Sequence, residues 1–263
     1  MFKLRYLGLA AAGFLTACGV SEPGVDELPD SDALATTEST VIVGSVDWVS
    51  TNSLSGTPAT RANAVAYLSI PQKGSRCTAW LVSDDVIITN NHCIARSTEA
   101  TGAKASFNYI DGVSSTQRIW YSCSTFLQTW KDLDMTALRC AALNGQLPGQ
   151  VYGKLTVSST NAATNDSIYV IHQNCDYKTD SSCVPNKKYS PGKILNANYS
   201  STDASYDADT LGGSSGSPVF SATTHEVVAL HHYGFNGDTL GRGTHNSGVR
   251  ATLIKNALAG IGL

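Results

Sequence analysis

Short strand-like segments separated by turns fill the chain from residue 64 onward, and they constrain the fold more than any other feature. Apolar and β-branched residues dominate these segments, which cover 64–70, 78–90, 117–123, 135–140, 167–173, 218–221 and 226–233. Turn-forming residues separate them, as in IDGVSS, LNGQLPGQ and NGDTLGRG. Many short strands at this spacing are typical of a sandwich or barrel rather than of a βαβ fold. The sequence therefore predicts an all-β fold.

Helical periodicity is confined to the end of the chain. In VRATLIKNALAG, residues 249–260, the side chains of Leu253, Ile254 and Leu258 fall on one face of a helix, and Gly260 can end it. We therefore expect a C-terminal helix after the last strand.

The first residues have the pattern of an export signal. Lys3 and Arg5 precede an apolar run, 6–15, that is too short to span a bilayer as a lasting helix. The run ends in LTACG, which resembles the bacterial lipoprotein box, in which cleavage before the cysteine leaves a lipidated N-terminus. We expect a lipoprotein signal peptide at 1–17 and lipidation at Cys18. An ordinary signal peptide, cut near Ala17 to release a secreted protein, is the alternative.

The expected location is the bacterial cell envelope, with the protein anchored through its lipid or secreted. Gly19 follows the cysteine where an aspartate would favour the inner membrane in that class, so the outer membrane is expected. Whether the domain faces the periplasm or the medium stays open.

An acidic segment separates this signal from the folded part. Together with Cys18 it forms the range 18–40, which has six acidic residues, no basic residue and almost no large apolar side chain. Such a segment cannot bury enough surface to fold, so we expect a flexible linker, with a short propeptide as the competing interpretation. The predicted domain is then 41–263. Its mildly acidic composition without clusters of Lys or Arg argues against binding to nucleic acid.

Seven cysteines are present, and six remain if lipid takes Cys18. An even number in an exported chain indicates disulfides, although six cysteines allow about 15 pairings. We expect the sequential pairs, Cys77–Cys93, Cys123–Cys140 and Cys175–Cys183. No Cys-x-x-Cys or His-x-x-x-His spacing supports a metal site. Metal binding is therefore rejected.

Three separate blocks carry residues suited to nucleophilic catalysis. His92 stands beside a cysteine in TNNHC, Asp134 directly precedes the apolar strand MTAL, and Ser215 lies in the glycine-rich turn GGSSGSP. Asp132 could replace Asp134, but it does not directly precede the strand. Glycine-x-serine-x-glycine, the esterase pattern, does not fit because Ser217 stands two places after Ser215.

Taken together, these blocks resemble those of the chymotrypsin-like (trypsin-like) serine peptidase family. The resemblance extends from about residue 41 to the end of the chain, and the three blocks occur in that family's order. It implies two six-stranded antiparallel β-barrels, with the site between them, and a C-terminal helix. This agrees with the all-β reading of the strand pattern.

The chemistry of such a site requires these residue types. A serine hydroxyl becomes a good nucleophile only when a neighbouring imidazole takes its proton, and a buried carboxylate fixes the tautomer of that imidazole. Glycines allow a sharp turn, so that the N–H groups of Gly213 and Ser215 can form an oxyanion hole. We expect His92, Asp134 and Ser215 to be the catalytic residues. The chemistry requires no metal and no organic cofactor.

The resemblance also suggests a substrate pocket, with two opposing indications. Asp209 lies where the trypsin subgroup has a pocket aspartate, which would favour Lys or Arg before the scissile bond. Thr210 and His231 lie where the glutamyl endopeptidase subgroup has pocket residues, which would favour Glu or Asp. The block GGSSGSPVF is nearer to the second subgroup, so acidic substrates are the expectation. The alternative for His231 and His232 is that they are two histidines of one strand and have no role in substrate binding.

Ser214 indicates how the site is activated. Trypsin-like zymogens switch on when a freed N-terminal ammonium pairs with an aspartate at this position, and serine has no charge to offer. We therefore expect the oxyanion turn to be preformed, with no need for cleavage before Val41 or Ile42.

The expected function is that of an exported serine endopeptidase that acts on proteins or peptides through an acyl-enzyme. A catalytically silent peptide-binding lipoprotein and a non-peptidase acyl hydrolase of the same fold are the two alternatives. Membrane contact is expected only through the N-terminal lipid, and the oligomeric state stays open.

Overall fold

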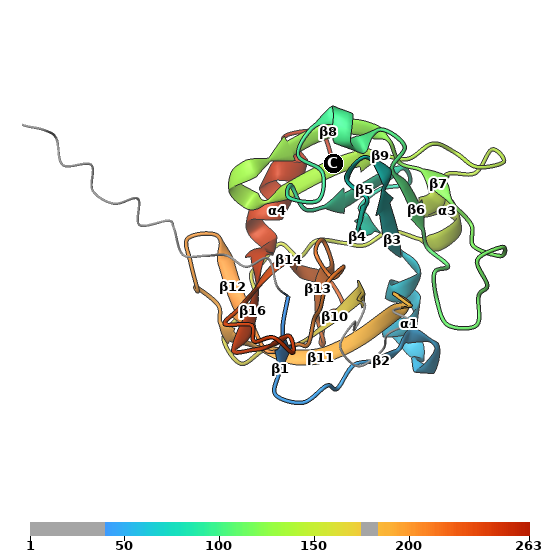
Figure 1. Ribbon diagram of the computed structural model, residues 1–263. Coiled ribbons are helices and arrows are strands. Elements are labelled where there is room, and N and C mark those ends of the chain that lie inside the picture. Colours follow the sequence, from blue (N-terminus) through green and yellow to red (C-terminus); the bar gives the residue numbers. More distant parts are fainter. Residues whose placement is uncertain (1–39, 175–183) are drawn as a thin grey trace, which may run out of the picture. The chain divides into compact units, whose positions relative to one another are not determined.

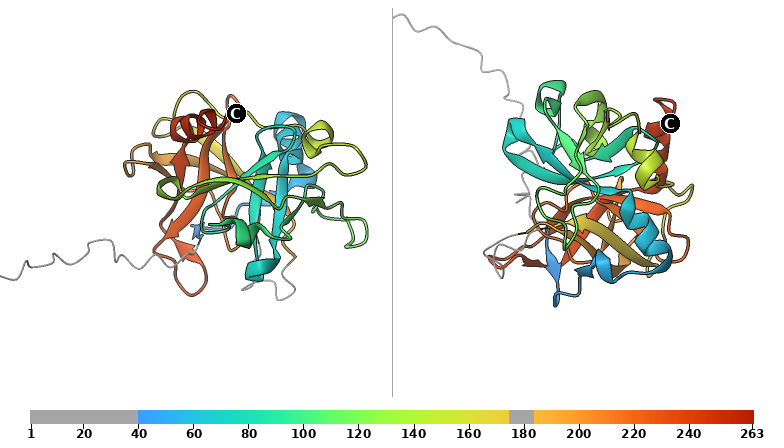
Figure 2. Two further views of the ribbon diagram at one scale, coloured as in Figure 1. Left: turned by 90° about the horizontal axis from the view of Figure 1, so that it is seen from above. Right: turned by 90° about the vertical axis from the view of Figure 1, so that its right-hand side faces the viewer.

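Two antiparallel β-sheets, one mainly from each half of the chain, build the fold (Figure 1). The computed structural model describes residues 40–174 and 184–263, all of which belong to a compact unit that spans Thr36–Leu263. Figure 2 shows the cyan and green strands of the first sheet beside the orange and red strands of the second.

The first sheet has seven strands in the order β7-β6-β3-β4-β5-β9-β8. Their bounds are β3 Val65–Ile70, β4 Ser75–Leu81, β5 Val86–Thr89, β6 Lys104–Ser106, β7 Tyr121–Ser122, β8 Thr125–Trp130 and β9 Met135–Arg139. All residues of β5 and the first four of β9 are buried, which explains the unbroken sequences VIIT and MTAL. Strands covered on both faces have no solvent side that would require a polar alternation.

The second sheet also has seven strands, in the order β10-β13-β14-β16-β12-β11-β2. Their bounds are β2 Val49–Ser50, β10 Ser167–Gln173, β11 Lys187–Asn196, β12 Asp203–Tyr206, β13 Pro218–Ser221, β14 Val227–Phe235 and β16 His245–Arg250. A further pairing between β10 and β11 closes six of these strands into a barrel, to which β2 adds at β11. A separate parallel pair joins β1 Ile42–Val43 to β15 Arg242–Gly243.

Helices are few and short apart from the one at the end. They are α1 Gly56–Asn63, α2 Ser97–Ala100, α3 Pro148–Tyr152 and α4 Ala251–Ala259, with 3-10 turns at Thr51–Ser53, Pro71–Lys73 and Lys131–Leu133. Helix α4 follows β16 and packs on β14 and β16. The predicted all-β class with two antiparallel barrels and a C-terminal helix is confirmed, with the second barrel closed and the first sheet a half-barrel.

One hydrophobic cluster links the two sheets. It includes Trp80 from the first sheet, Tyr169 and Leu230 from the second, and Ile254 from α4, all of them almost fully buried. Each such side chain contributes roughly 1.5–3 kcal/mol through its burial. The two sheets therefore share a core, and residues at their junction are held in fixed positions.

Two of the three predicted disulfides are present, Cys77–Cys93 and Cys123–Cys140. Their sequence separations are 16 and 17 residues. A loop of about 15 residues closed in this way stabilises a protein by about 3 kcal/mol, mainly by restricting the unfolded chain. The third predicted pair, Cys175–Cys183, lies outside the described residues.

The predicted signal peptide (1–17), the lipidation site Cys18 and the linker (18–40, except its last residue) also lie outside the described residues, so these assignments stay predictions. Within residues 40–174 and 184–263, no helix has both the length and the apolar character needed to cross a membrane.

Candidate active site

Two hydrogen bonds join His92 to Asp134 at the ends of neighbouring strands. His92 follows β5 and Asp134 precedes β9, and these two strands pair in the first sheet. His92 Nδ1 lies 2.7 Å from Asp134 Oδ2, and the His92 backbone N–H donates to Asp134 Oδ1 at 2.8 Å. Both oxygens of one carboxylate therefore hold one residue, which fixes the direction of the imidazole ring.

The backbone of Asp134 is held as firmly as its side chain. Asp134 ends the 3-10 turn Lys131–Leu133 with φ +41°, a left-handed conformation that aspartate adopts more readily than most residues. Its carbonyl accepts hydrogen bonds from the Asn91 N–H at 3.0 Å and from Asn90 Nδ2 at 2.9 Å. The two asparagines before His92 thus tie the histidine loop to the aspartate, a role that the sequence alone did not reveal.

Asp134 is ionised at neutral pH although it is nearly buried. Burial would raise the pKa of its carboxyl, but contacts with His232 and His92 outweigh burial and hold the pKa below its ordinary range. A carboxylate in this state can accept a hydrogen bond from the Nδ1–H of His92 and stabilise a positive charge on its ring.

Ser215 lies in a turn that two glycines make possible. Gly213 and Gly216 have φ values of +101° and +85°, where a larger residue would be strained. A Cβ on Gly216 would also collide with Thr78 and Thr89. The turn is anchored because Thr78 N–H donates to the Ser215 carbonyl at 2.8 Å.

The anchors of this turn connect it to the histidine loop. Thr78 follows Cys77, whose disulfide partner Cys93 follows His92. Thr89, which packs against Gly216, ends the strand that leads to His92. Ser215 and His92 are therefore both fixed to the end of the same pair of strands, β4 and β5.

Three amides of the turn donate to backbone carbonyls. Ser214 N–H donates to the Leu211 carbonyl at 2.9 Å, Gly216 N–H to the His231 carbonyl at 3.0 Å, and Ser217 N–H to the Ser214 carbonyl at 3.0 Å. In the part of the chain that the structure describes, no backbone carbonyl accepts from the N–H of Gly213 or Ser215. Among the described residues, neither amide donates to another group.

Ser214 is neutral and fully buried, as its position demands. Its hydroxyl lies 2.7 Å from His172 Nδ1 and accepts the Leu211 N–H at 3.2 Å. Burial, with a smaller contribution from Lys188, lowers the pKa of His172 to about 3, so the ring is uncharged. At the position where the resemblance places the ion pair that activates trypsin-like zymogens, this chain has a hydrogen bond between two uncharged groups. Nothing in the sequence pattern around His172 predicts this contact.

Asp209 binds the N-terminal segment. Its carboxylate accepts the N–H groups of Val43 at 2.7 Å and Asp47 at 3.0 Å. Burial raises the pKa of this carboxyl to about 6, although the two amides oppose the rise and the nearby Asp47 adds to it. Thr210 is also engaged, because its hydroxyl donates to Asn246 Oδ1 at 2.8 Å. The two predicted pocket residues thus have internal partners.

His231, the third predicted pocket residue, has one free ring nitrogen. Its Nδ1 lies 2.6 Å from the Tyr206 hydroxyl, while its buried Nε2 has no hydrogen-bond partner among the described residues. Burial lowers its pKa well below the ordinary value, and nearby His232 and His172 contribute. The ring is therefore neutral and carries one unsatisfied polar atom.

The geometry agrees with a comparison against protein families. A family described as a trypsin-like peptidase domain matches residues 77–230, which is more than half of the chain. The chain belongs to the trypsin-like peptidase family. The matched residues include all three predicted catalytic residues, His92, Asp134 and Ser215.

One relative is similar in sequence, and solved structures are similar in fold. "Secreted RxLR effector protein 73" from Plasmopara viticola is 32% identical over 186 residues, which is 66% of this chain and 45% of that protein. The trypsin-like chain thus spans less than half of that relative. A Glu endopeptidase structure in complex with MPD is similar at TM-score 0.57 and 19% identity, covering 84% of this chain and 99% of the other. Rv3671c from M. tuberculosis, a Ser343Ala mutant in an inactive form, is similar at 0.56 and 16%, covering 84% and 97%.

One contact of the trypsin-like site was not predicted. His232 is buried with Nε2 3.0 Å from Asp203 Oδ2 and Nδ1 3.5 Å from Asp134 Oδ2. The sequence presented His231 and His232 only as a pair on one strand, whose alternation would send them to opposite faces. No pattern in the amino-acid sequence predicted that both histidines are buried.

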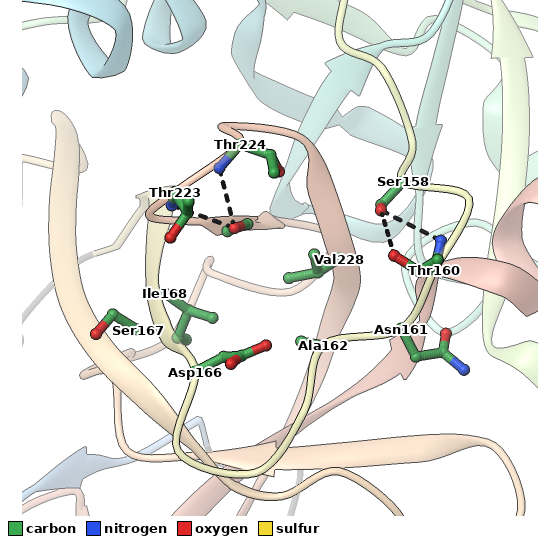
Figure 3. Close-up of a pocket in the computed structure, with 11 residues that line it drawn as sticks. Ser158, Thr160, Asn161, Ala162, Asp166, Ser167, Ile168, Thr223, Thr224 and Val228 are labelled. Atoms are coloured by element: carbon green, nitrogen blue, oxygen red, sulfur yellow. Dashed lines mark hydrogen bonds between the residues drawn. The ribbon is translucent and has the colours of Figure 1, made fainter.

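A polar cavity of about 290 Å³ lies elsewhere in the second barrel of this trypsin-like fold (Figure 3). Figure 3 shows hydroxyl side chains such as Thr160 and Thr224 around it, together with Asn161 and Asp166. None of the predicted catalytic or pocket residues lines this cavity.

Proposed function

We propose that this chain is an exported serine endopeptidase that hydrolyses peptide bonds through an acyl-enzyme intermediate. Ser215 is the nucleophile, His92 the general base and then the general acid, and Asp134 the residue that orients His92. The observation that carries the proposal is the two-point hold of Asp134 on His92 at 2.7 Å and 2.8 Å. Thr78 anchors the Ser215 turn, and its neighbour Cys77 is joined by a disulfide to Cys93, which follows His92.

The chemistry proceeds in two balanced halves. His92 Nε2 takes the Ser215 proton as Oγ attacks the carbonyl carbon, and the same proton then passes to the leaving amine. Water repeats these steps on the ester, releases the acid and returns the proton to Ser215. The amides of Gly213 and Ser215 bind the oxyanion in both halves, and a donor of this kind contributes about 3–4 kcal/mol to transition-state stabilisation.

Acidic side chains before the scissile bond fit the pocket better than basic ones. Asp209 is occupied by the amides of Val43 and Asp47, so its charge is directed to the N-terminal segment. His231 Nε2 is left without a partner among the described residues. The Tyr206 hydroxyl has one proton and two neighbours, His231 Nδ1 at 2.6 Å and the Ser247 carbonyl at 3.0 Å. In the tautomer that would recognise a carboxylate, this proton goes to Nδ1 and the proton of the neutral His231 ring lies on Nε2.

An exported location is consistent with the remaining observations. Disulfides persist in oxidising compartments, and two are present here. The relative from Plasmopara viticola is named as a secreted protein. The lipoprotein box at Cys18 is the basis for a lipid anchor in the bacterial envelope, with proteins or peptides as the substrates.

A fluorophosphonate probe followed by a peptide library tests the proposal. The full chain should be labelled at Ser215, Ser215→Ala should not be labelled, and Ser221→Ala should react like the wild type because Ser221 lies at the end of β13. Cuts should follow Glu or Asp. An unlabelled wild-type chain would indicate a silent protein, turnover of esters but of no peptide would indicate another acyl hydrolase, and cuts after Lys or Arg would refute the pocket assignment.

A further inference from the structure

His232 is a buried histidine that the proposed chemistry does not use, although it contacts the catalytic carboxylate. Its Nδ1 lies 3.5 Å from Asp134 Oδ2 and its Nε2 lies 3.0 Å from Asp203 Oδ2. The side chain is 6% exposed, and those of the two carboxylates are 10% and 12% exposed. The chain thus places one imidazole between two buried acids.

This arrangement favours a positively charged ring. Nε2 hydrogen-bonds to Asp203, whereas Nδ1 lies at ion-pair distance from Asp134 without a hydrogen bond among the described residues. A doubly protonated ring can therefore donate to Asp203 and attract the Asp134 carboxylate through its charge. Burial by itself would lower the pKa of His232, but the carboxylates of Asp134 and Asp203 outweigh it and raise the pKa to about 9. The positive charge of the His232 ring thus compensates two buried negative charges, those of Asp134 and Asp203.

A β-bulge brings His232 into this position. His231 pairs with Gly248 and Tyr233 pairs with Ser247, so His232 is an extra residue between two successive rungs of the ladder. Consecutive residues of a regular strand point to opposite faces, and a bulge redirects one of them. His231 and His232 can therefore both be buried, one beside Tyr206 and one beside Asp134.

Asp203 is itself fixed. The Thr202 hydroxyl donates to its Oδ1 at 2.8 Å, and its N–H donates to the Ser200 hydroxyl at 2.9 Å. Its other oxygen, Oδ2, faces His232 Nε2. The histidine is thus attached to β12 on one side and reaches Asp134 on the other.

We propose that His232 is a positioning residue of the catalytic centre, whose ring, anchored by Asp203, holds the Asp134 carboxylate where it bonds to His92. The inference rests on the proposed triad of His92, Asp134 and Ser215. Asp134 Oδ2 lies within 2.7 Å of His92 and 3.5 Å of His232, so one oxygen serves both rings. The Tyr233 ring is near both, with centroids 5.5 Å from His92 and 4.3 Å from His232.

The consequence is a dependence of activity on the proton of His232. When the ring loses one proton it also loses its positive charge, so its attraction for the Asp134 carboxylate is lost and the hold on Asp134 weakens. The titratable and charged groups around this ring are Asp134 before β9, Asp203 and Tyr206 on β12, His92 after β5, His231 and Tyr233 on β14, and Arg250 at the end of β16.

The rate of fluorophosphonate labelling between pH 6 and pH 10.5 tests the inference without a choice of substrate. Labelling of the wild type should fall on the alkaline side with a midpoint near pH 9. His232→Gln should react about tenfold more slowly at pH 7 and should lack that fall. His225→Asn is the matched control, since His225 contacts Tyr169 and has a φ of +56° that asparagine tolerates. It should behave like the wild type.

A second variant covers the case in which His232→Gln does not fold. Asp203→Asn keeps the shape of the site but removes one negative charge, so its alkaline midpoint should be lower by about one pH unit. A wild-type profile in either folded variant would overturn the role of His232.

Nitrogen NMR of the histidine rings needs no variant at the site. In the Ser215→Ala chain, a doubly protonated imidazole should persist at pH 8, and a chain in which every ring is singly protonated would overturn the inference. A wild-type chain that is never labelled would overturn the triad, and the role of His232 with it. Labelling with an unchanged His232→Gln profile would overturn the role of His232 alone.

Discussion

Two adjacent histidines of strand β14 lie in surroundings of very different chemistry. His231 bonds to the Tyr206 hydroxyl and is neutral. His232 lies between Asp134 and Asp203 and is charged. The two residues are adjacent in the chain and both are buried. Their difference cannot come from depth in the protein.

The comparison teaches that partners, not burial, decide the charge of an internal base. Burial lowers the pKa of both rings, and only the two carboxylates reverse the direction at His232. Lys187 supports this conclusion. Its Nζ donates to the carbonyls of Ala62 and Phe107 at 2.7 Å and 2.8 Å, yet burial lowers its pKa to about 7. Carbonyl dipoles do not replace a carboxylate.

Removal of the charge from Asp134 should have the largest effect on activity. Asp134→Asn leaves the shape of the site intact, but it removes the acceptor that fixes the tautomer of His92 and the charge that faces His232. The labelling rate and kcat should fall by about 10⁴-fold, as in a related triad, with a small change in KM. Stopped-time labelling and peptide kinetics measure this, and Asp132→Asn is the control. A loss below tenfold would contradict the assignment of Asp134.

The sequence predicted the parts of this site that depend on local patterns. TNNHC, the aspartate before MTAL and the glycine turn are contiguous blocks, and the cysteine spacing predicted the two disulfides that are present. The all-β class followed from strand length and turn residues. Each of these features is encoded within a few neighbouring residues.

The rest depends on contacts between distant segments. A bulge shifts the register of β14 against β16, and no residue type in LHHYG marks it. Asp203 reaches His232 across 29 positions, and Asp209 turns to Val43 across 166. The sequence offered Asp209 as a pocket acid because it could be placed only by its distance from Ser215. The direction of its side chain is set by the N-terminal segment.

His232→Gln should remove a pH-dependent part of the stability. The pKa of His232 in the folded protein is about 9, above the ordinary histidine value of 6.5. This contribution is therefore fully present below pH 6.5 and is lost as the pH rises through 9. At 1.36 kcal/mol per pKa unit, the advantage of the wild type over the variant should shrink by about 3 kcal/mol across that window.

Urea unfolding at pH 6.5 and pH 9.5 measures this difference, with both proteins carrying Ser215→Ala to prevent self-cleavage. His225→Asn should show no change between the two pH values. A wild-type advantage that stays constant would mean that His232 is neutral in the folded protein.

His231→Gln should change substrate preference without changing the pH dependence that belongs to His232. Loss of the imidazole should lower kcat/KM for a peptide with Glu before the scissile bond by about 10- to 100-fold, or roughly 1.4–2.8 kcal/mol. A matched peptide with Gln should lose less. The alkaline fall in labelling near pH 9 should be unchanged, because it belongs to His232. Equal losses for both peptides would show that His231 does not recognise charge.

Tyr206→Phe should have the smallest effect. The Tyr206 hydroxyl donates to the Ser247 carbonyl at 3.0 Å or to His231 Nδ1 at 2.6 Å, so its loss leaves buried polar atoms without a partner. The free energy of unfolding at pH 7 should fall by about 1–2 kcal/mol, measured in urea. Since the same hydroxyl orients His231, kcat/KM for the Glu peptide should fall a few-fold while the Gln peptide stays near the wild type. A shift in the alkaline midpoint of labelling would mean that the surroundings of His231 affect the pKa of His232. The two histidines would then not be independent.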